Sequence, residues 1–495
     1  MTEAPPGEGG SIQGGRHVAR NSAWLIGQPL ALNVISIGST AFIARTIGPT
    51  GFATFNIGMA FALMFAPLTN MGLRALTVRH LAQNREGERV YLGTVLALRL
   101  VLAMLAFGMV MLAAPLGSDS QATRNVASVA AFVLLFNTVV GVLSDGFHAR
   151  EDMGRPARAA MVGGLVLTIA SVIAVASGGG PTALALTYLL GPAINAVILW
   201  HYAGQIGIRP TLTWNPPEFR RLLAEALPFF GQGLLDSFSG RLDLFLLART
   251  VGEANLGGYT AATGLLGRAA IVVDGSATAL LPSLARLRTT NPEQATPLMR
   301  TMLLWLMALT LPLAVGIAIA APEIMSLLYG SKYLDGAPVL AIACFTLPLT
   351  AAAVVLGHGL FVVHRNRLVV GTSMASTSAT TAMLIPGTLT LGLIGAPIAR
   401  VCGRLMLVIL RTPAALREYG KVWRWNDSKR LILLTATIGV PAAIARLLGG
   451  GVELMLAAGA LGSTLYFFTM WRLGMVPDAL QERAVGFLRS WVRRR

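Results

Sequence analysis

The sequence Ala44-Arg-Thr-Ile-Gly48 returns, with one change, as Ala248-Arg-Thr-Val-Gly252. The two copies lie 204 residues apart, which is close to half of the chain. Each copy follows one long apolar run and precedes another, so the two occupy equivalent places in two hydropathy patterns. This placement indicates an internal duplication. Duplicated halves within a membrane protein are typical of transporters, which handle their substrate between the halves.

The composition is that of a membrane protein. Of the 495 residues, 54% are hydrophobic and 12% are charged, and the mean hydropathy is +0.66. A soluble domain carries about 25% charged residues, roughly twice this level. Because a backbone within the bilayer must satisfy its own hydrogen bonds, we expect an all-α polytopic membrane protein.

Apolar runs long enough to cross the hydrocarbon layer predict about 14 transmembrane helices. They cover residues 22–44, 52–73, 90–114, 126–148, 159–177, 182–203, 222–248, 257–284, 301–320, 338–363, 368–389, 393–415, 431–449 and 452–472.

The distribution of basic residues gives an independent test of these helices. With the N-terminus in the cytoplasm, cytoplasmic connections hold 29 of the 39 Lys and Arg residues, and outer connections hold five. This follows the positive-inside rule and predicts that both termini are cytoplasmic. The formal charge of +17 is therefore explained by loops that face anionic membrane lipids, and no nucleic-acid partner is expected.

An even number of spans separates the two copies, so the halves run in the same direction and form a parallel repeat. The basic C-terminal tail has the pattern of a short amphipathic helix on the membrane surface, with a solvated tail as the alternative. The predicted parts are a disordered cytoplasmic tail (1–21), a six-helix bundle (22–203), a cytoplasmic linker (204–221), a second six-helix bundle (222–415), helices 13 and 14 (416–472) and the C-terminal tail (473–495).

Short strings occur in a characteristic order along most of the chain. They are Arg45-Thr-Ile-Gly-Pro-Thr-Gly-Phe-Ala-Thr-Phe55, Asn70-Met-Gly-Leu-Arg-Ala-Leu-Thr-Val-Arg79, Ala226-Leu-Pro228, Arg241-Leu-Asp-Leu-Phe245, Gly258-Tyr-Thr-Ala-Ala262, Leu281-Pro-Ser-Leu-Ala285, Tyr329-Gly-Ser-Lys-Tyr333 and Gly395-Ala-Pro-Ile-Ala399. From about residue 20 to 415 the chain thereby resembles the bacterial polysaccharide-biosynthesis flippases of the multidrug/oligosaccharidyl-lipid/polysaccharide exporter superfamily.

The resemblance implies a V-shaped molecule in the bacterial cytoplasmic (inner) membrane that alternates between inward- and outward-open states. It would flip a polyprenyl-diphosphate-linked oligosaccharide to the outer leaflet, and polysaccharide assembly proteins are possible partners. A diphosphate headgroup cannot cross hydrocarbon unaided, so such a cavity needs buried cations. An intramembrane ionisable residue is costly to insert and is therefore a candidate for function.

The span at 222–248 carries a polar stripe. Gln232, Asp236 and Asp243 follow the spacing of one helix face. We expect this face to line the cavity, with Gln232 touching substrate and Asp236 or Asp243 binding a coupling proton or sodium ion. The alternative is that Asp243 is a structural acid paired with an arginine. Asp274, near the inner end of the next span, is a further carboxylate candidate.

Arginines within the spans are candidates for binding the diphosphate, because a planar guanidinium suits phosphate oxygens. Arg400 and Arg404 share one face of the span at 393–415 with Arg411, which lies close enough to the cytoplasm to snorkel. The alternative for Arg400 and Arg404 is ion pairing or snorkelling. The other candidates are Arg99, Arg268 and Arg241, the last of which is expected to meet another helix.

Two polar features have weaker assignments. Asn33 begins a polar stripe on the first span, which suits either sugar contacts or ordinary hydrogen bonds between helices. Asp145 lies nearer the cytoplasm and is expected to pair with Arg150 or a neighbour.

Other chemistry has little support in the sequence. A Gly-rich loop ending in Lys-Ser/Thr and a His-Glu-x-x-His string are both absent, so neither ATP nor a metal cofactor is expected. The outer loops are short, which argues against a membrane glycosyltransferase. Lipid II transport remains an alternative, as does an ion-coupled drug exporter, although the intramembrane arginines disfavour a cationic drug. A transport-inactive scaffold is the remaining alternative.

Overall fold

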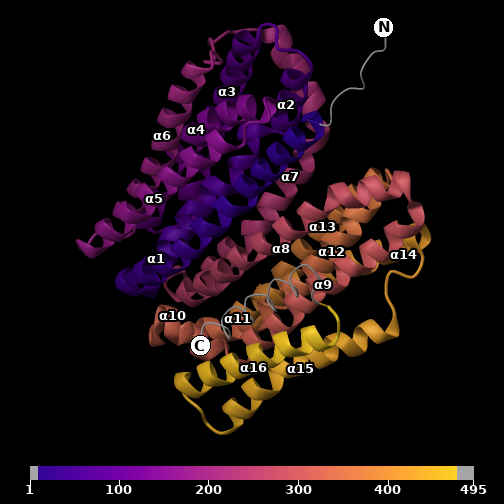
Figure 1. Ribbon diagram of the computed structural model, residues 1–495. Helices are drawn as coiled ribbons and strands as arrows, with labels where there is room; N and C mark the ends of the chain where they lie inside the picture. The colour runs from indigo at the N-terminus through magenta and orange to yellow at the C-terminus, as the bar shows by residue number, and fades with distance from the viewer. Residues whose placement is uncertain (1–8, 476–495) are drawn as a thin grey trace, which may run out of the picture. The chain divides into compact units, whose positions relative to one another are not determined.

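The computed structural model describes the backbone of residues 9–475 and the side chains of residues 35–475, except 228–229, 232, 254, 271–272, 274 and 276–280. This part of the chain consists of α-helices and short 3-10 helices, and it contains no strand (Figure 1). The all-α membrane fold predicted from the sequence is confirmed.

The described residues up to Ala261, together with Thr388–Gly392, form one compact unit. Its helices are α1 (Gly9–Asn70), α2 (Leu73–Gln83), α3 (Glu88–Gly117), α4 (Gln121–Ala149), α5 (Gly154–Ala176), α6 (Pro181–Gln205), α7 (Pro216–Thr250) and the 3-10 helix η1 (Glu253–Leu256). Because α1 is helical from Gly9, residues 9–21 extend the first predicted span. The rest of the predicted N-terminal tail lies outside the described residues, as does the predicted amphipathic helix near the C-terminus.

Polar residues and prolines set where these apolar helices begin. The Ser120 side chain accepts a hydrogen bond from the backbone N–H of Thr123 at the start of α4, and Asn215 caps α7 in the same way. Pro181 and Pro216 are the first residues of α6 and α7, where a missing N–H has no helical partner to lose.

Helix α4 lies at the centre of the first unit, where it packs against α1, α3 and α6 (Figure 1). Its inner face supplies Leu143 and Phe147, which pack with Leu92 and Val95 of α3 in a buried cluster. Helix α7 also packs on α1. The first unit therefore includes α7, which the sequence assigns to the second bundle.

The second unit contains residues 262–387 and the described residues from Leu393 onward. The elements from here on are α8 (Gly257–Thr290), α9 (Pro292–Ile319), α10 (Ala321–Tyr329), the 3-10 helix η2 (Ser331–Gly336), α11 (Ala337–Ala343), α12 (Thr346–Val362), α13 (Asn366–Leu391), the 3-10 helix η3 (Gly392–Ile394), α14 (Gly395–Tyr419), α15 (Trp425–Leu447) and α16 (Val452–Arg472).

Helix α9 organises the second unit, because α12 packs against it and α15 does as well. Met299 and Leu303 of α9 are buried against Val355 of α12. The last two helices, α15 and α16, lie side by side as a pair (Figure 1). The Tyr466 hydroxyl of α16 donates a hydrogen bond to the Ala308 carbonyl of α9 at 3.0 Å, which fixes this pair on α9.

Within the side chains described, ten helical segments are long and apolar enough to cross a membrane. Two of these segments, Ile35–Gln83 and Asn366–Tyr419, contain two predicted spans each. All predicted spans fall largely on helix, but those at 222–248 and 257–284 are not among these ten segments of the described residues, so the count of 14 stays a prediction.

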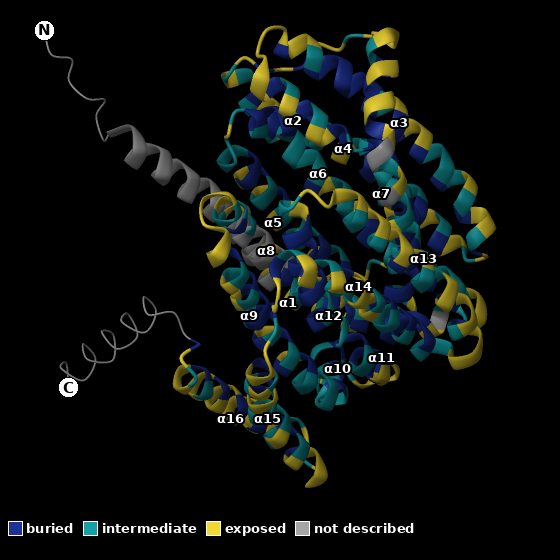
Figure 2. Cartoon of the chain, turned by 90° about the vertical axis from the view of Figure 1, so that its right-hand side faces the viewer, coloured by how far each residue is buried: buried dark blue, intermediate teal, exposed yellow. Residues whose placement is uncertain are grey.

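The outer faces of the helices are apolar as well as exposed. Leu112, Val197, Ile432 and Phe467 each expose about two thirds or more of their surface. Figure 2 shows exposed residues along much of α15 and α16. Large exposed apolar surfaces mark contact with a membrane or a partner, and here they face outward from helices of membrane-spanning length.

The duplicated sequence adopts the same unusual backbone conformation in both copies. Gly48, where α1 kinks, has φ 74°, and Gly252, two residues after the end of α7, has φ 90°. Residues with a Cβ rarely adopt this left-handed region, so glycine is required at both places. The segments that follow the two copies also meet, because η1 packs on α1 and a Cβ built on Gly257 would lie 2.5 Å from the Cα of Pro49.

The second copy is tied to the turn between α3 and α4 by polar contacts. The Glu253 carboxylate of η1 accepts hydrogen bonds from the hydroxyls of Ser118 and Thr123, the latter at 2.7 Å. Arg249 donates to the Leu116 carbonyl at 2.5 Å. These contacts hold the end of α7 and η1 on the first unit.

Candidate functional site

The acids of α7 occupy two different environments. Asp236 is exposed, whereas Asp243 is only 3% exposed. The buried hydroxyl of Tyr259, at the start of α8, donates a hydrogen bond to Oδ2 of Asp243. Tyr259 belongs to one of the strings on which the family resemblance rests. The predicted stripe is thus one accessible carboxylate and one buried carboxylate held by a tyrosine.

The neighbouring polar candidates on α7 are only partly defined. Arg241 is half-buried, and its Nη1 donates to the Gly240 carbonyl of its own helix at 3.1 Å. The side chain of Gln232 lies outside the described residues, as do those of Asn33 and Asp274.

A buried ion pair joins α3 and α4 in the first unit. Nη1 of Arg99 donates to Oδ2 of Asp145 at 2.9 Å, and the two side chains are 5% and 2% exposed. Nε of Arg99 also donates to the Thr69 carbonyl at the end of α1 at 3.2 Å. Arg99 therefore connects three helices, and its charge is balanced by a carboxylate.

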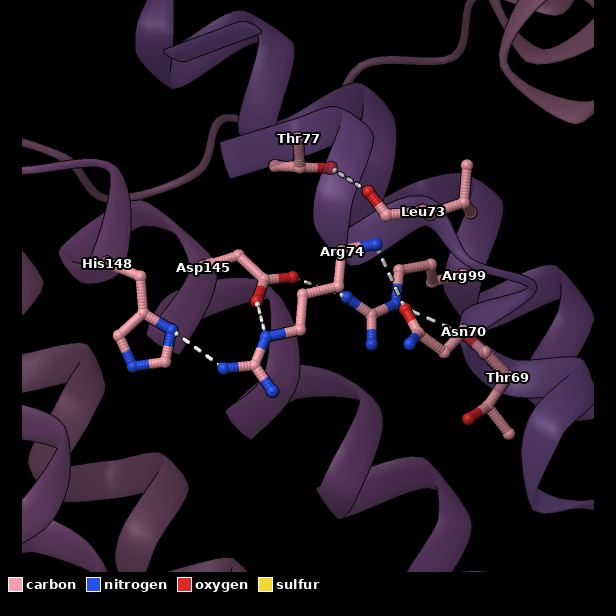
Figure 3. Close-up of polar contacts among 8 residues, drawn as sticks. All are labelled: Thr69, Asn70, Leu73, Arg74, Thr77, Arg99, Asp145 and His148. Carbon is pink, nitrogen blue, oxygen red and sulfur yellow. Dashed lines mark hydrogen bonds and ion pairs between the residues drawn. The ribbon is translucent and has the colours of Figure 1, made fainter. Parts of the chain in front are cut away.

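A second guanidinium extends this pair toward the surface. Figure 3 shows Arg74 between the Asp145 carboxylate and the ring of His148. Nε of Arg74 lies 3.5 Å from Oδ1 of Asp145, and its Nη2 lies 3.1 Å from Nδ1 of His148. The Arg74 side chain is 60% exposed. We call Arg74, Arg99, Asp145 and His148 the α4 cluster; with His148 neutral it has two positive charges and one negative charge.

The structure corrects the expected partner of Asp145. Arg150 does not pair with it but with Glu88, through Nη2 to Oε2 at 2.5 Å. This hydrogen bond raises the pKa of Arg150 above its usual value. Asp145 instead binds Arg99 and Arg74, because its position on α4 points it into the interface with α3 rather than toward the helix end.

The three arginines of α14 differ sharply in exposure. Arg404 is exposed, Arg400 is half-buried, and Arg411 is 6% exposed. Arg411 does not snorkel as expected from its nearness to the cytoplasm. The space for its guanidinium comes from Gly357 of α12, where a Cβ would lie 2.7 Å from Nη1 of Arg411.

Arg411 binds neutral oxygens. Nη1 donates to the Ala353 carbonyl at 2.7 Å, and Nη2 donates to the Ser373 hydroxyl at 2.8 Å and to the Val369 carbonyl at 3.3 Å. Nε donates to the Thr372 hydroxyl at 3.3 Å. Among the described residues, no carboxylate contacts this side chain. Among the described residues of the second unit, this full positive charge is therefore stabilised by dipoles.

Arg268, the arginine candidate on α8, is half-buried. Burial raises the pKa of Tyr329 above its usual value, and the positive charge of Arg268 acts in the opposite direction. The charge of Arg268 thus acts on the Tyr329 hydroxyl at the end of α10. Its predicted contact with substrate stays a prediction.

Sequence reasoning missed Arg74 and His148 as parts of the cluster, and it placed Arg411 wrongly. Arg74 was visible only as one of several basic residues after the second span. His148 lies three residues after Asp145, on nearly the same helix face, which was the one available signal.

Comparisons with solved structures define the class of this fold. Over 89% of this chain and 96% of the other, the structure superposes on the lipid II flippase MurJ in an inward closed conformation, with a TM-score of 0.74 and 12% identity. An inward-facing multidrug resistance MATE family transporter of the MOP superfamily matches 81% of this chain and 99% of its own, with a TM-score of 0.63 and 15% identity. A MOP superfamily transporter from Pyrococcus furiosus matches 82% and 96%, with a TM-score of 0.57 and 16% identity. The protein has the fold of membrane transporters and flippases.

The family follows from the sequence itself. Residues 18–288, more than half of the chain, match the model of the polysaccharide biosynthesis protein family. The chain belongs to this family, as the resemblance of its short strings indicated. No curated protein matches the sequence.

Proposed function

We propose that this protein flips a polyprenyl-diphosphate-linked oligosaccharide from the inner to the outer leaflet of a bacterial cytoplasmic membrane, by alternating access between two six-helix bundles. Both termini are cytoplasmic in this proposal, and polysaccharide assembly proteins receive the product. Membership of the polysaccharide biosynthesis family supports the pathway. The positive charge of α14 is the observation that supports an anionic, diphosphate-linked substrate.

The arginines of α14 favour an anionic headgroup. Arg411 holds a positive charge that no carboxylate among the described residues offsets, and Arg400 and Arg404 lie on the same helix. Arg404 is exposed, so its guanidinium is accessible to a ligand. A guanidinium binds phosphate oxygens with two parallel hydrogen bonds. We assign Arg400 and Arg404 to the diphosphate, with Arg411 as a fixed charge that strengthens the local positive potential.

The α4 cluster gives the first unit a net positive charge, as the arginines of α14 do in the second unit. Within the cluster, only Arg74 is widely exposed. In the proposed topology Arg74 lies at the cytoplasmic side, where the lipid-linked substrate is made. We therefore assign Arg74 to the first contact with the diphosphate, and Arg99 to holding Asp145 in place.

The acids of α7 suit ion coupling. Asp236 is accessible to an ion, and Asp243 is a buried carboxylate held by Tyr259. We propose that Asp236 or Asp243 carries a proton or sodium ion during the cycle, with Asp274 as a further carboxylate. Gln232, Arg241, Arg268 and Asn33 remain proposed contacts for the sugar or the diphosphate.

Lipid II is the second candidate substrate. The superposition on MurJ covers most of both chains, and that protein is a lipid II flippase. At 12% identity this likeness supports the fold rather than the ligand. Lipid II also carries a diphosphate, so the arginines of α14 fit both candidates and the sugar must be distinguished by experiment.

The test uses the purified full-length protein in liposomes that contain a fluorescent polyprenyl-diphosphate oligosaccharide or fluorescent lipid II. Exposure of the headgroup is measured with and without a proton or sodium gradient. The variants are Arg404→Gln and Asp243→Asn, and the control is Arg417→Gln, an exposed arginine at the end of the same helix α14.

We expect the oligosaccharide lipid to be flipped and the rate to fall at least tenfold in Arg404→Gln, with little change in Arg417→Gln. Loss of the gradient dependence in Asp243→Asn would support the coupling role. If the wild-type protein flips lipid II and leaves the oligosaccharide lipid at the rate of empty liposomes, the second candidate replaces the first.

A further inference from the structure

A cavity of about 470 Å³ opens in the second unit where α9 and α15 end. Its walls are apolar residues of α9, α10, α11 and α15, apart from Arg446. The lining includes Ile319, Pro322, Pro338, Ala341 and Ala443. Small-molecule sites commonly have volumes of about 300–1,000 Å³ and apolar walls with a few polar groups. The cavity therefore has the size and lining for an apolar chain with a polar end.

The cavity lies at the level of the lipid headgroups. Helices α9 and α15 are both apolar spans, and they end beside it at Ile319 and Leu447. Leu447 and Leu448 are 87% and 73% exposed, so the protein surface next to the cavity is apolar. The end of a transmembrane span meets the interface between hydrocarbon and headgroups. In the proposed topology this is the outer leaflet.

The mouth of the cavity carries both a cation and an anion. Nη1 of Arg446 donates to the two carboxylate oxygens of Glu323 at 3.0 and 3.2 Å, and to the Ile319 carbonyl at 3.2 Å. Within the described residues, the hydrogen bonds of Arg446 all use Nη1. A guanidinium has five N–H donors, and each carboxylate oxygen accepts more than one bond. The pair therefore keeps donors on Arg446 and acceptor sites on Glu323 for a ligand.

We propose that this cavity binds a phosphatidylethanolamine molecule of the membrane. One acyl chain occupies the alanine-lined cavity, the phosphate accepts hydrogen bonds from Nε and Nη2 of Arg446, and the ammonium group donates to Glu323. The zwitterionic headgroup matches the ion pair at both of its charges. A phosphatidylglycerol has no ammonium group for Glu323, and a polyprenyl diphosphate would bring its two negative charges against that carboxylate.

The experiment is native mass spectrometry of the full-length protein in detergent, with equal amounts of dioleoyl phosphatidylethanolamine and dioleoyl phosphatidylglycerol. Glu323→Gln removes the ammonium partner, and Ala443→Leu fills the cavity. Glu218→Gln, which breaks the ion pair with Arg221 on α7, is the matched control. Thermal unfolding of each variant reports whether it folds.

We expect phosphatidylethanolamine to bind at least tenfold better than phosphatidylglycerol in the wild type and in Glu218→Gln. In Glu323→Gln the preference should reverse, because the charge of Arg446 then favours the anionic lipid. In Ala443→Leu both lipids should bind at least tenfold more weakly. Equal binding of the two lipids by the wild type, an unchanged preference in Glu323→Gln, or unchanged binding in folded Ala443→Leu would each overturn the proposal. Displacement of phosphatidylethanolamine by a polyprenyl diphosphate in the wild type but not in Ala443→Leu would assign the cavity to substrate instead.

Discussion

Arg99 of α3 and Asp145 of α4 form a buried ion pair in which Nη1 and Oδ2 are 2.9 Å apart. Arg99 depends on this carboxylate for its counter-charge, because the two side chains are only 5% and 2% exposed. The pair also holds α1, since Arg99 donates to the Thr69 carbonyl. It is therefore a structural connection between three helices.

Breaking this pair on one side should be strongly destabilising. Asp145→Asn leaves Arg99 charged and buried, which costs about 3–5 kcal/mol. We expect a lower thermal midpoint in detergent than for Glu218→Gln, whose more exposed pair contributes about 0–1 kcal/mol. The double variant Arg99→Met with Asp145→Leu should recover most of the loss. If the double variant is as unstable as Asp145→Asn, the ion pair is not the cause.

A side chain at Gly48, where α1 kinks, should lower the stability of the protein. Gly48 has φ 74° and ψ 171°, a region open almost only to glycine, and holding another residue there costs about 1–3 kcal/mol. Gly48→Ala should lower stability by this amount, measured by thermal unfolding, and Gly252→Ala should behave alike. Gly38→Ala on the same helix is the control, because nothing lies within 4 Å of its Cβ position. An equal effect at Gly38 and Gly48 would contradict the backbone explanation.

Lysine should fail to replace Arg411. An ammonium is a compact group, whereas the guanidinium of Arg411 reaches four oxygens on α12 and α13. Each buried acceptor that loses its donor costs about 1–3 kcal/mol, so Arg411→Lys should unfold at a clearly lower temperature. Arg417→Lys, at an exposed position of the same helix, should unfold like the wild type. Equal midpoints for the two variants would show that the guanidinium shape is unimportant.

Glu253 should control the exposure of the turn between α3 and α4. Glu253→Ala removes the acceptor for Ser118 and Thr123, and charge-assisted bonds of this kind contribute about 1.5–3 kcal/mol each. We expect faster amide hydrogen exchange at residues 116–123. Exposed Glu293 provides the control variant, Glu293→Ala, in which exchange at this turn should not change.

The helices were predictable because a bilayer leaves few alternatives. An apolar run of sufficient length must be helical, and the positions of Ser120, Asn215, Pro181 and Pro216 mark helix starts by local chemistry. The repeat was also predictable, because the positive φ of Gly48 and Gly252 requires glycine at the same place in both copies. The positions of the spans do not show which helices pack together. Helix α7, for example, packs on α1 of the first unit.

The candidate site was predictable as a set of charges but not as a set of partners. Arg99 and Asp145 are 46 residues apart, and only the packing of α3 on α4 brings them together. The burial of Arg411 depends on Gly357, just as Arg99 depends on Gly141, where a Cβ would also lie 2.7 Å from its Nη2. The position of Arg411 within its span indicates only its depth in the membrane. Depth does not show that a neighbouring helix has a glycine beside the guanidinium.

The approach of Pro49 to Gly257 has a consequence for how the two halves diverge. A duplicated gene normally frees each copy to accumulate its own substitutions. Here Pro49, directly after the first copy, approaches Gly257, which lies five residues beyond the end of the second copy, with no room for a methyl group between them. A Cβ at 257 would meet the backbone Cα and carbonyl oxygen of residue 49, so no choice of side chain at residue 49 makes room for it. Glycine is therefore required at 257 as long as the two segments pack this closely, however far the rest of the two halves diverge.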